Sequence, residues 1–184
     1  MDEDIVHEIM QRYIMQRYNA TLLVKFSKNI DIESFTTFKN CFSYKIGNDA
    51  VFKLFSDGNC RILLKNYSMD NADFYIYSFC HYLKTRMNDD DIYVVDQKIC
   101  HINCVLNVAG GLDVDNIVNK LLENGFRDKK RNNCCGCFTT LSYLYNGIKG
   151  EVTVGKPAIS IRGKFPYFNL FTKFKNHVEE ILKI

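Results

Sequence analysis

The sequence predicts an α+β protein of two quasi-repeats, whose curved antiparallel sheet is covered by helices on one face and bare on the other. Two observations lead to this fold class. The same order of patterns occurs twice along the 184 residues: a strand, a short helix, a group of strands and a long helix. The two passes are also in step, because Asn19 and His101 lie 82 positions apart and so do the helix-capping residues Asp31 and Asp113.

Later landmarks keep this correspondence with a growing offset. Phe42 and Phe138 are 96 positions apart, and Leu63 and Arg162 are 99 positions apart. The additional residues fall in turns and connections, where insertions are tolerated. The spacing therefore favours an internal duplication. The parts that we expect are an N-terminal helical extension over 1–16, a first repeat over 17–90 and a second repeat over 91–184.

The composition is that of a folded protein without a membrane-spanning segment. Hydrophobic residues make up 47% of the chain and charged residues 24%, which is typical of a protein with a sizeable core. No run of 18 or more apolar residues occurs, so no transmembrane helix is expected. The net charge of +3 is too small to indicate a nucleic-acid-binding protein, so the distribution of charge has to decide that question.

The eight cysteines and the start of the chain indicate a reducing compartment. The opening MDEDIVHEIMQRY is acidic and amphipathic and lacks the features of a signal peptide, so the cysteines are expected to be thiols. With two prolines, no tryptophan and abundant Asn, Ile, Lys, Tyr and Phe, the composition suggests an A·T-rich genome, such as that of a large DNA virus. The expected location is then the nucleus or a cytoplasmic viral factory of an infected cell.

The elements of the first repeat follow from periodicity and capping residues. A strand is expected over 19–26, and Asp31 caps a short helix after it. Further strands are expected over 42–46 and in a hairpin over 51–65. Ser68 then caps a long helix, since apolar residues recur after it with helical spacing. The apolar stripe of that helix consists of Ala72, Ile76, Phe79, Cys80 and Leu83.

The second repeat shows the same succession. It begins with a strand around His101, and a helix follows that Asp113 caps and Gly125 ends. The remaining expected elements are strands over 138–145, 151–154 and 158–162, and a long helix that starts near Tyr167.

The hairpin VFKLFSDGNCRILLK presents two different faces. Phe52 and Ile62 belong to the face that looks like ordinary core. Lys53, Phe55, Arg61 and Leu63 point to the opposite face, around a Ser-Asp-Gly turn. A large aromatic side chain on a basic sheet face fits neither a core nor a solvated surface, which makes this face a candidate binding site. Ordinary cross-strand packing and a merely solvated basic face remain the alternatives.

The order of elements and several residues resemble the TATA-binding protein family over roughly residues 17–184. Leu54-Phe55-Ser56-Asp57-Gly58-Asn59 is similar to the family's pattern around its second wedge phenylalanine, and Phe138-Thr-Thr-Leu-Ser-Tyr143 is similar to its Phe-Pro-Gly-Leu-Ile-Tyr motif. The resemblance implies a saddle whose concave face lies in the minor groove and whose phenylalanines wedge between base steps, as is known for that family.

The resemblance also implies positions for the DNA-binding residues. Phe42, Phe55 and Phe138 fall on three of the four wedges, and Asn19 falls on a groove-reading asparagine. Two positions depart from the family, since Val154 stands at the fourth wedge and His101 at the second asparagine. The complete expected set is Asn19, Phe42, Lys53, Phe55, Arg61, Leu63, His101, Asn103, Phe138, Val154 and Arg162.

Two other kinds of site have weaker support. Cys134, Cys135 and Cys137 could form a zinc site together with Cys100, His101 and Cys104, but no CxxC pair occurs and strand alternation puts His101 opposite the two cysteines of its strand. A Cys–His nucleophile could be built from the same residues, although no local motif supports one. We therefore expect buried thiols, no metal, no cofactor and no enzymatic activity.

The function implied by the resemblance is to bind and bend A·T-rich promoter DNA through the minor groove and to recruit initiation factors and RNA polymerase. One alternative is a protein-interaction subunit of a transcription complex that keeps the fold without binding DNA, and another is a clamp-like ring around DNA. The exposed concave face could also support a dimer.

Overall fold

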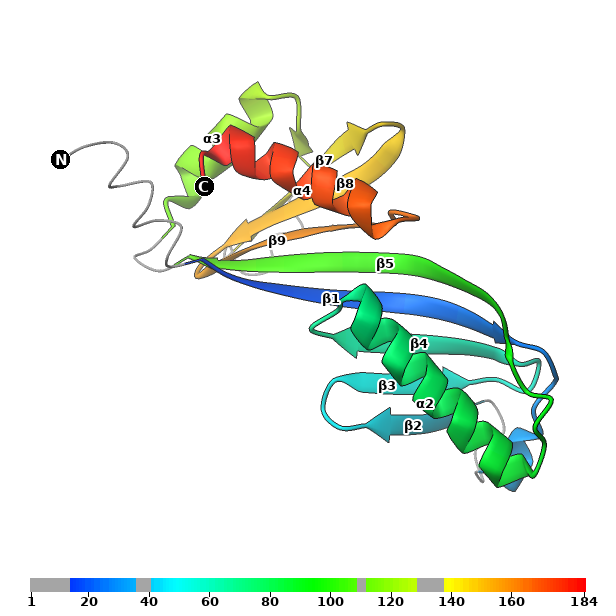
Figure 1. Ribbon diagram of the computed structural model, residues 1–184. Coiled ribbons are helices and arrows are strands. Elements are labelled where there is room, and N and C mark those ends of the chain that lie inside the picture. Colours follow the sequence, from blue (N-terminus) through cyan, green and yellow to red (C-terminus); the bar gives the residue numbers. More distant parts are fainter. Residues whose placement is uncertain (1–13, 36–40, 109–111, 129–137) are drawn as a thin grey trace. The chain divides into compact units, whose positions relative to one another are not determined.

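The computed structural model describes residues 14–35, 41–108, 112–128 and 138–184 (Figure 1). These residues form two compact units. The first unit is Tyr18–His101, and the second unit is Ile102–Ile184 together with the described residues up to Arg17. Two long strands belong in part to each unit, β1 (Ile14–Phe26) and β5 (Val94–Val108).

The first unit is an antiparallel sheet with one long helix. Its strands follow the order β2-β3-β4-β1-β5. Besides its parts of β1 and β5, its elements are η1 (Ile32–Ser34), β2 (Phe42–Ile46), β3 (Ala50–Leu54), β4 (Asn59–Lys65) and α2 (Met69–Met87).

Helix α2 runs along one face of β2, β3 and β4 (Figure 1). The predicted stripe from Ala72 to Leu83 is the buried side of the helix. Phe79 stacks on Phe52 of β3 with 4.3 Å between the ring centroids, and Tyr82 stacks on Tyr44 of β2 at the same distance. Stacked aromatic pairs of this kind contribute about 1 kcal/mol beyond the area they bury.

The predicted caps hold the helices of both repeats in place. The side chain of Asp31 accepts from the Glu33 amide at 3.1 Å, and Ser68 Oγ accepts from the Asn71 amide at 3.1 Å. Asp113 accepts from the Asn116 amide, also at 3.1 Å. Each cap satisfies a backbone donor that the first helical turn would otherwise leave unpaired.

The second unit has the same plan. Its strands follow the order β5-β9-β8-β7-β6. Besides its parts of β1 and β5, its elements are α3 (Val114–Glu123), β6 (Arg127–Asp128), β7 (Phe138–Tyr145), β8 (Ile148–Gly155), β9 (Ala158–Gly163) and α4 (Phe168–Leu182).

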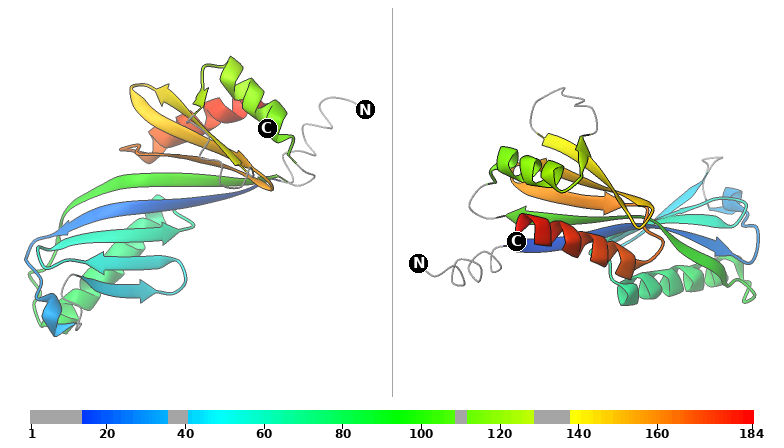
Figure 2. Two further views of the ribbon diagram at one scale, coloured as in Figure 1. Left: turned by 180° about the vertical axis from the view of Figure 1, so that it is seen from behind. Right: turned by 90° about the horizontal axis from the view of Figure 1, so that it is seen from above.

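Helices α3 and α4 pack against each other, and α3 also packs against β7 and β8 (Figure 2). The core under α4 is aromatic, with Phe174 stacked on Phe165 at 5.2 Å between centroids. Phe174 lies directly over Gly150 of β8, so close that a Cβ there would be 2.3 Å from the ring. The helix packs this tightly on the sheet because glycine leaves room for it.

The internal duplication is visible in the strand register. Thr21 of β1 pairs with Leu63 of β4, and Asn103 of β5 pairs with Arg162 of β9. These two pairs are related by the same offsets of 82 and 99 positions that the sequence shows. The repeats therefore correspond position by position, at least in the strands that these pairs join.

Three expectations about elements need correction. Residues 14–16, expected at the end of a helix, belong to β1, because pairing in the sheet overrides their weak helical periodicity; residues 1–13 lie outside the described residues. Strand β5, expected around His101, begins as early as Val94, and Arg127 and Asp128 form a short edge strand, β6, that is not among the expected elements. No helix in the described ranges is both long enough and apolar enough to cross a membrane.

Candidate nucleic-acid interface

In each unit the strands have one face under the helices and one face turned away from them, which we call the open face. Strand β4 shows the alternation clearly: Cys60, Ile62 and Leu64 are buried, whereas the residues between them are exposed. Cross-strand partners share a face, so the strand registers extend this assignment to β1 and β3. Leu63, 41% exposed, marks the open face of the first unit.

The open face of the first unit is cationic. All charged side chains that β1 to β4 place on it are lysine or arginine. Lys53 and Arg61 lie directly opposite each other, in the middle of the β3–β4 pair. The cations on this face are Lys25, Lys45, Lys53, Arg61 and Lys65.

Most of these cations have no acidic partner. In the described part of the chain, no carboxylate lies within ion-pair distance of Lys53 or Arg61, nor of Lys45 or Lys65. Like charges placed opposite each other on a sheet are destabilising. This arrangement is therefore better suited to an anionic partner than to the free protein.

The β3–β4 turn brings an acid, Asp57, next to this face. Lys25 donates to the backbone carbonyl of Asp57. The amide of Asn59 donates to the Asp57 carboxylate at 3.0 Å, and this bond, helped by the Asn59 side chain and the charge of Lys25, lowers the pKa of Asp57. The ionised carboxylate caps the turn and fixes the backbone just after Phe55.

Phe55 lies where the sequence places it, at the end of β3 beside the turn. Its amide donates to the Asn59 carbonyl at 2.8 Å, which pairs it with a residue of the open face. Its side chain is half-buried. Phe55 thus extends the open face next to the Lys53–Arg61 pair, as expected.

Gly58 makes this turn possible. Its φ of +77° is in the left-handed region, and a Cβ there would lie 2.3 Å from the Lys28 carbonyl oxygen. No other residue fits at this position without moving the backbone. Gly58 is thus both part of the segment that resembles the TATA-binding protein family and the residue that the geometry of this turn requires.

The open face of the second unit is polar and combines its cations with an acid, Glu151. Ser160 Oγ donates to Asn103 Oδ1 at 2.7 Å, and the hydroxyls of Thr140 and Thr153 are 3.0 Å apart. Phe138, at the start of β7, is 56% exposed and is the aromatic side chain of this face. Its partner across the β7–β8 pair is Gly155.

Arg162 is on the open face of the second unit but is not free. Its Nε and one terminal nitrogen lie 3.1 Å and 3.0 Å from Glu151 Oε2. Both side chains come from paired positions on β8 and β9. A guanidinium held by a carboxylate in this way is a poorer phosphate ligand than the unpaired cations of the first unit.

The comparisons with known proteins address the fold. No family model matches the sequence, and no curated protein matches it. Methanococcus jannaschii TBP, a solved structure, is similar over 94% of this chain and 98% of that chain, with a TM-score of 0.57 and 17% identity. This chain has the fold of a TATA-binding protein. The predicted fold class is thereby confirmed.

A second solved structure has a related fold. It is the crystal structure of A. aeolicus tRNASec in complex with M. kandleri SerRS. The match covers 91% of this chain but 30% of that chain, with a TM-score of 0.51 and 10% identity. At such identities the likeness concerns the fold alone.

Within the TBP fold, Phe42 is not on the open face, which corrects the prediction. It pairs with Leu54, a fully buried residue, and its ring stacks on Tyr82 of α2 at 6.3 Å between centroids. The ring of Phe35 also contacts the ring of Phe42, with 5.0 Å between their centroids. The prediction was one residue out of register, and a slip by one residue moves a side chain to the other face. Continuing the β2–β3 register by one residue brings Cys41, the residue before Phe42, opposite Phe55.

The prediction that Val154 is a wedge on the open face is wrong for the same reason. It is fully buried and pairs with the buried Ile159 under the helices. The strand registers of the two repeats make Val51 of β3 equivalent to Glu151 of β8, an offset of 100 positions. The same offset makes Gly155, the residue after Val154, the counterpart of Phe55. Each unit of this TBP fold therefore has one aromatic candidate wedge, opposite a small residue.

The remaining expected residues line the open faces. Asn19 pairs with Lys65, and Leu63 pairs with Thr21, all on the open face of the first unit. His101 and Asn103 alternate with buried Ile102 on β5, so they occupy the open side of that strand.

The cysteines do not gather into a metal site in the described ranges, which hold no cluster of three or more His, Cys, Asp and Glu side chains suited to a metal. Cys104 is buried, whereas His101 lies on the opposite side of β5. Cys134, Cys135 and Cys137 lie outside the described residues.

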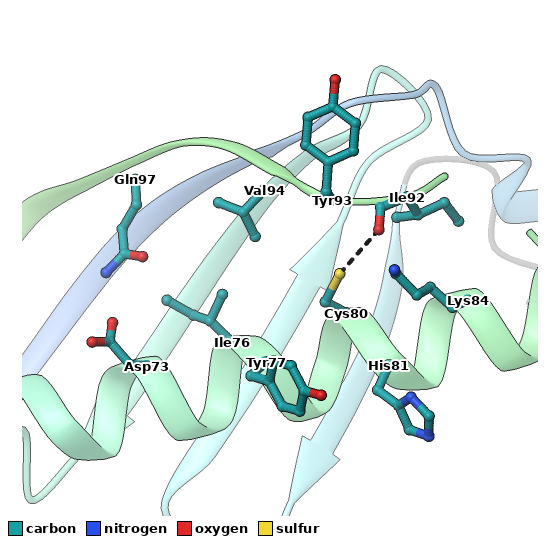
Figure 3. A pocket seen from close by; sticks show the side chains of 10 residues that line it. All are labelled: Asp73, Ile76, Tyr77, Cys80, His81, Lys84, Ile92, Tyr93, Val94 and Gln97. Carbon is teal, nitrogen blue, oxygen red and sulfur yellow. Dashed lines mark hydrogen bonds between the residues drawn. The ribbon is translucent and has the colours of Figure 1, made fainter. Parts of the chain in front are cut away.

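A separate cavity of about 360 Å³ lies in the first unit between α2 and the start of β5 (Figure 3). Cys80 Sγ donates to the Ile92 carbonyl at 3.4 Å at its base, and Ile76 and Val94 contribute apolar surface. This cavity is on the helical side of the unit. Sequence reasoning did not find it, because its lining residues come from two segments that only the fold brings together. The remaining lining residues are Asp73, Tyr77, His81, Lys84, Tyr93 and Gln97.

Proposed function

We propose that the protein is a transcription initiation factor that binds and bends A·T-rich promoter DNA through the minor groove. The observation that supports this most strongly is the open face of the first unit. There Phe55 lies on the row next to the Lys53–Arg61 pair, and no carboxylate pairs with either cation in the described residues. An apolar wedge among unpaired cations is complementary to a base step between phosphates.

In the proposed mechanism Phe55 and Phe138 press between base pairs. Partial unstacking costs a few kcal/mol per step, and the additional surface in contact with the bent DNA offsets that cost. Flexible steps such as TA are cheaper to kink, which gives a sequence preference without base-specific hydrogen bonds. Asn19, Asn103 and His101 would contact the floor of the groove, where A·T and G·C can be told apart.

The two small residues opposite the wedges limit the deformation. Cys41 and Gly155 stand where a second aromatic side chain would be required in each unit, and neither can unstack a base step. We therefore expect a smaller bend than four wedges would produce. Catalysis is not part of the proposal.

Recruitment of other initiation factors and RNA polymerase would use the helical side. Phe74 and Tyr77 of α2 are 63% and 76% exposed there, and Tyr93 beside the cavity is 60% exposed. Exposed aromatic residues of this kind are enriched at protein interfaces. The setting that we propose is the nucleus or a viral factory, in a reducing compartment.

A protein-interaction subunit without DNA binding is the second candidate. Two observations favour it: each open face has a single aromatic candidate wedge, and Arg162 forms an ion pair with Glu151. An exposed apolar patch around Leu63 or Phe138 would then bind protein, and in the free state it could join two copies of this chain.

The deciding experiment measures DNA bending and affinity together. An A·T-rich duplex with donor and acceptor dyes at its ends is titrated with wild type, Phe55→Ala and Phe138→Ala across a salt series. Tyr77→Ala and Tyr167→Ala are the matched controls, because both remove exposed aromatic side chains away from the open faces. A G·C-rich duplex and an RNA duplex of equal length test the groove preference.

We expect energy transfer to change with wild type and both controls, and to change far less with either phenylalanine variant. Affinity should fall steeply as salt rises. If wild type neither binds nor bends the duplex at low salt, the DNA-binding function is wrong and the protein-interaction function replaces it.

A further inference from the structure

The two open faces differ in charge at positions that the duplication makes equivalent. The register offsets place Thr153 at the position of Lys53 and Ser160 at the position of Arg61. The same offsets place Asn107 at the position of Lys25. At these three positions a cation of the first unit is replaced by a neutral hydrogen-bonding residue in the second, whereas the offset of 99 positions relates Lys65 to another cation, Lys164.

The neutral residues of the second unit are already bonded to each other. Ser160 donates to Asn103, and Thr153 shares a hydrogen bond with Thr140. Arg162 is bound to Glu151, whose side chain is only 17% exposed, so the acid is well placed to hold it. The strands bring three further cations to this face: Arg127 lies on an edge strand, Lys149 lies beside a hairpin turn, and Arg17 lies on β1, two positions before Asn19.

The cations of the first unit are held close together instead. Lys53 faces Arg61 across β3 and β4, Lys45 and Lys25 lie on the two neighbouring rows of the same sheet, and Lys65 lies one row beyond Lys45. The repulsion among these cations decreases when a polyanion takes the place of the small counterions around them. Each cation that meets a phosphate releases counterions, which makes the affinity depend on salt.

We propose that the first unit supplies nearly all of the phosphate contacts, while the second unit holds DNA through neutral contacts and Phe138. This inference rests on the proposed DNA-binding function. It goes beyond that function because it assigns the salt-dependent part of binding to one repeat and names its residues.

The test compares the salt dependence of duplex affinity for three pairs of substitutions in the full chain. Lys53→Thr with Arg61→Ser installs the residues of the second unit in the first. Arg127→Ser with Lys149→Ser removes two cations from the second unit. The third variant, Glu151→Gln with Arg162→Ser, removes its ion pair without changing the net charge. Thermal unfolding of each variant confirms that it is folded.

Between about 50 and 200 mM salt, the first double variant should lower the slope of log affinity against log salt by about 2, since each phosphate contact contributes about 0.9. Both second-unit variants should change the slope by less than about 0.5. An equal loss of slope in the first two variants would overturn the assignment. If polyglutamate displaces the duplex at equal charge concentration, the face is a general acidic-protein site and the inference is also wrong. Absence of wild-type binding would instead contradict the proposed function itself.

Discussion

Lys53 on β3 and Arg61 on β4 lie directly opposite each other in an antiparallel pair, and both side chains point away from α2. The described residues provide no carboxylate to separate them. The fold therefore contains a repulsive pair in the centre of a sheet, beside the exposed end of Phe55. An anionic partner would turn that repulsion into attraction.

Removing one charge of this pair should stabilise the free protein and weaken DNA binding. For Lys53→Gln we expect the free energy of unfolding to rise by about 0.3 kcal/mol at low salt, within the range measured for like charges on facing strands. The gain should vanish at high salt, because the repulsion between exposed charges is screened. Urea unfolding at two salt concentrations measures it. Lys98→Gln, an exposed lysine of β5, is the control. A loss of stability at low salt would show that the pair is not repulsive.

Phe42 and Val154 should matter for stability and not for DNA. Phe42→Ala removes a ring from the cluster with Tyr82, and Val154→Ala leaves a cavity in a fully buried site. We expect losses of about 2–3 and about 1–2 kcal/mol in the free energy of unfolding.

Bending of the labelled duplex, measured at saturating protein well below the unfolding transition, should match wild type in both variants. A Phe42→Ala protein that is fully folded but no longer bends DNA would restore Phe42 as a wedge.

The helix caps depend on local signals in the sequence, whereas the face that a strand residue occupies depends on the strand register to a single residue. The capping residues Asp31, Ser68 and Asp113 were predictable, because a cap is a local signal that needs no knowledge of neighbouring strands. The pairs Thr21–Leu63 and Asn103–Arg162 also follow the spacing that the sequence shows.

Register within the outer hairpins was not predictable to one residue. Phe42 and Val154 have the right character for a wedge or for a core, and only their pairing with Leu54 and Ile159 decides which face they occupy. The Glu151–Arg162 ion pair was missed as well, since 11 positions separate the two residues and only strand pairing joins them. Local patterns thus gave the elements, whereas the charge state of the second open face required the tertiary structure.

Gly150 should be irreplaceable in the second unit. A Cβ at this position would be 2.3 Å from Phe174 Cζ, and the ring is fully buried, so it cannot move without disturbing the core of α4. We expect Gly150→Ala to lower the free energy of unfolding by about 2 kcal/mol or more, as is common for overpacked cores.

Phe174→Leu in the Gly150→Ala background is the matched control for this prediction. The smaller side chain should recover part of the loss, measured as the midpoint of urea unfolding. If Gly150→Ala alone is as stable as wild type, α4 does not pack on the sheet as closely as the structure has it.

The buried thiol of Cys60 should make stability fall at high pH. Burial raises the pKa of Cys60 from its ordinary value of 9.0 to about 12. Below pH 9 the thiol is protonated in both the folded and the unfolded protein, and its full contribution to stability is present. Between 9.0 and about 12 the unfolded chain loses this proton while the folded protein keeps it, so the unfolded state binds fewer protons. The free energy of unfolding should then fall by up to about 1.4 kcal/mol per pH unit.

Cys60→Ala isolates this effect, because the lysines, tyrosines and other cysteines titrate alike in the variant and in wild type. We expect Cys60→Ala to be less stable than wild type at neutral pH, since it leaves a small cavity beside buried Ile62 and Val24. The difference should shrink as the pH rises above about 9 and then change sign, because only wild type has to keep a buried thiol protonated. Urea unfolding of both proteins under reducing conditions at several pH values measures the crossing. Parallel curves over that range would mean that Cys60 ionises as readily in the folded protein as in the unfolded one, and hence that water reaches the β3–β4 pair from the side of α2.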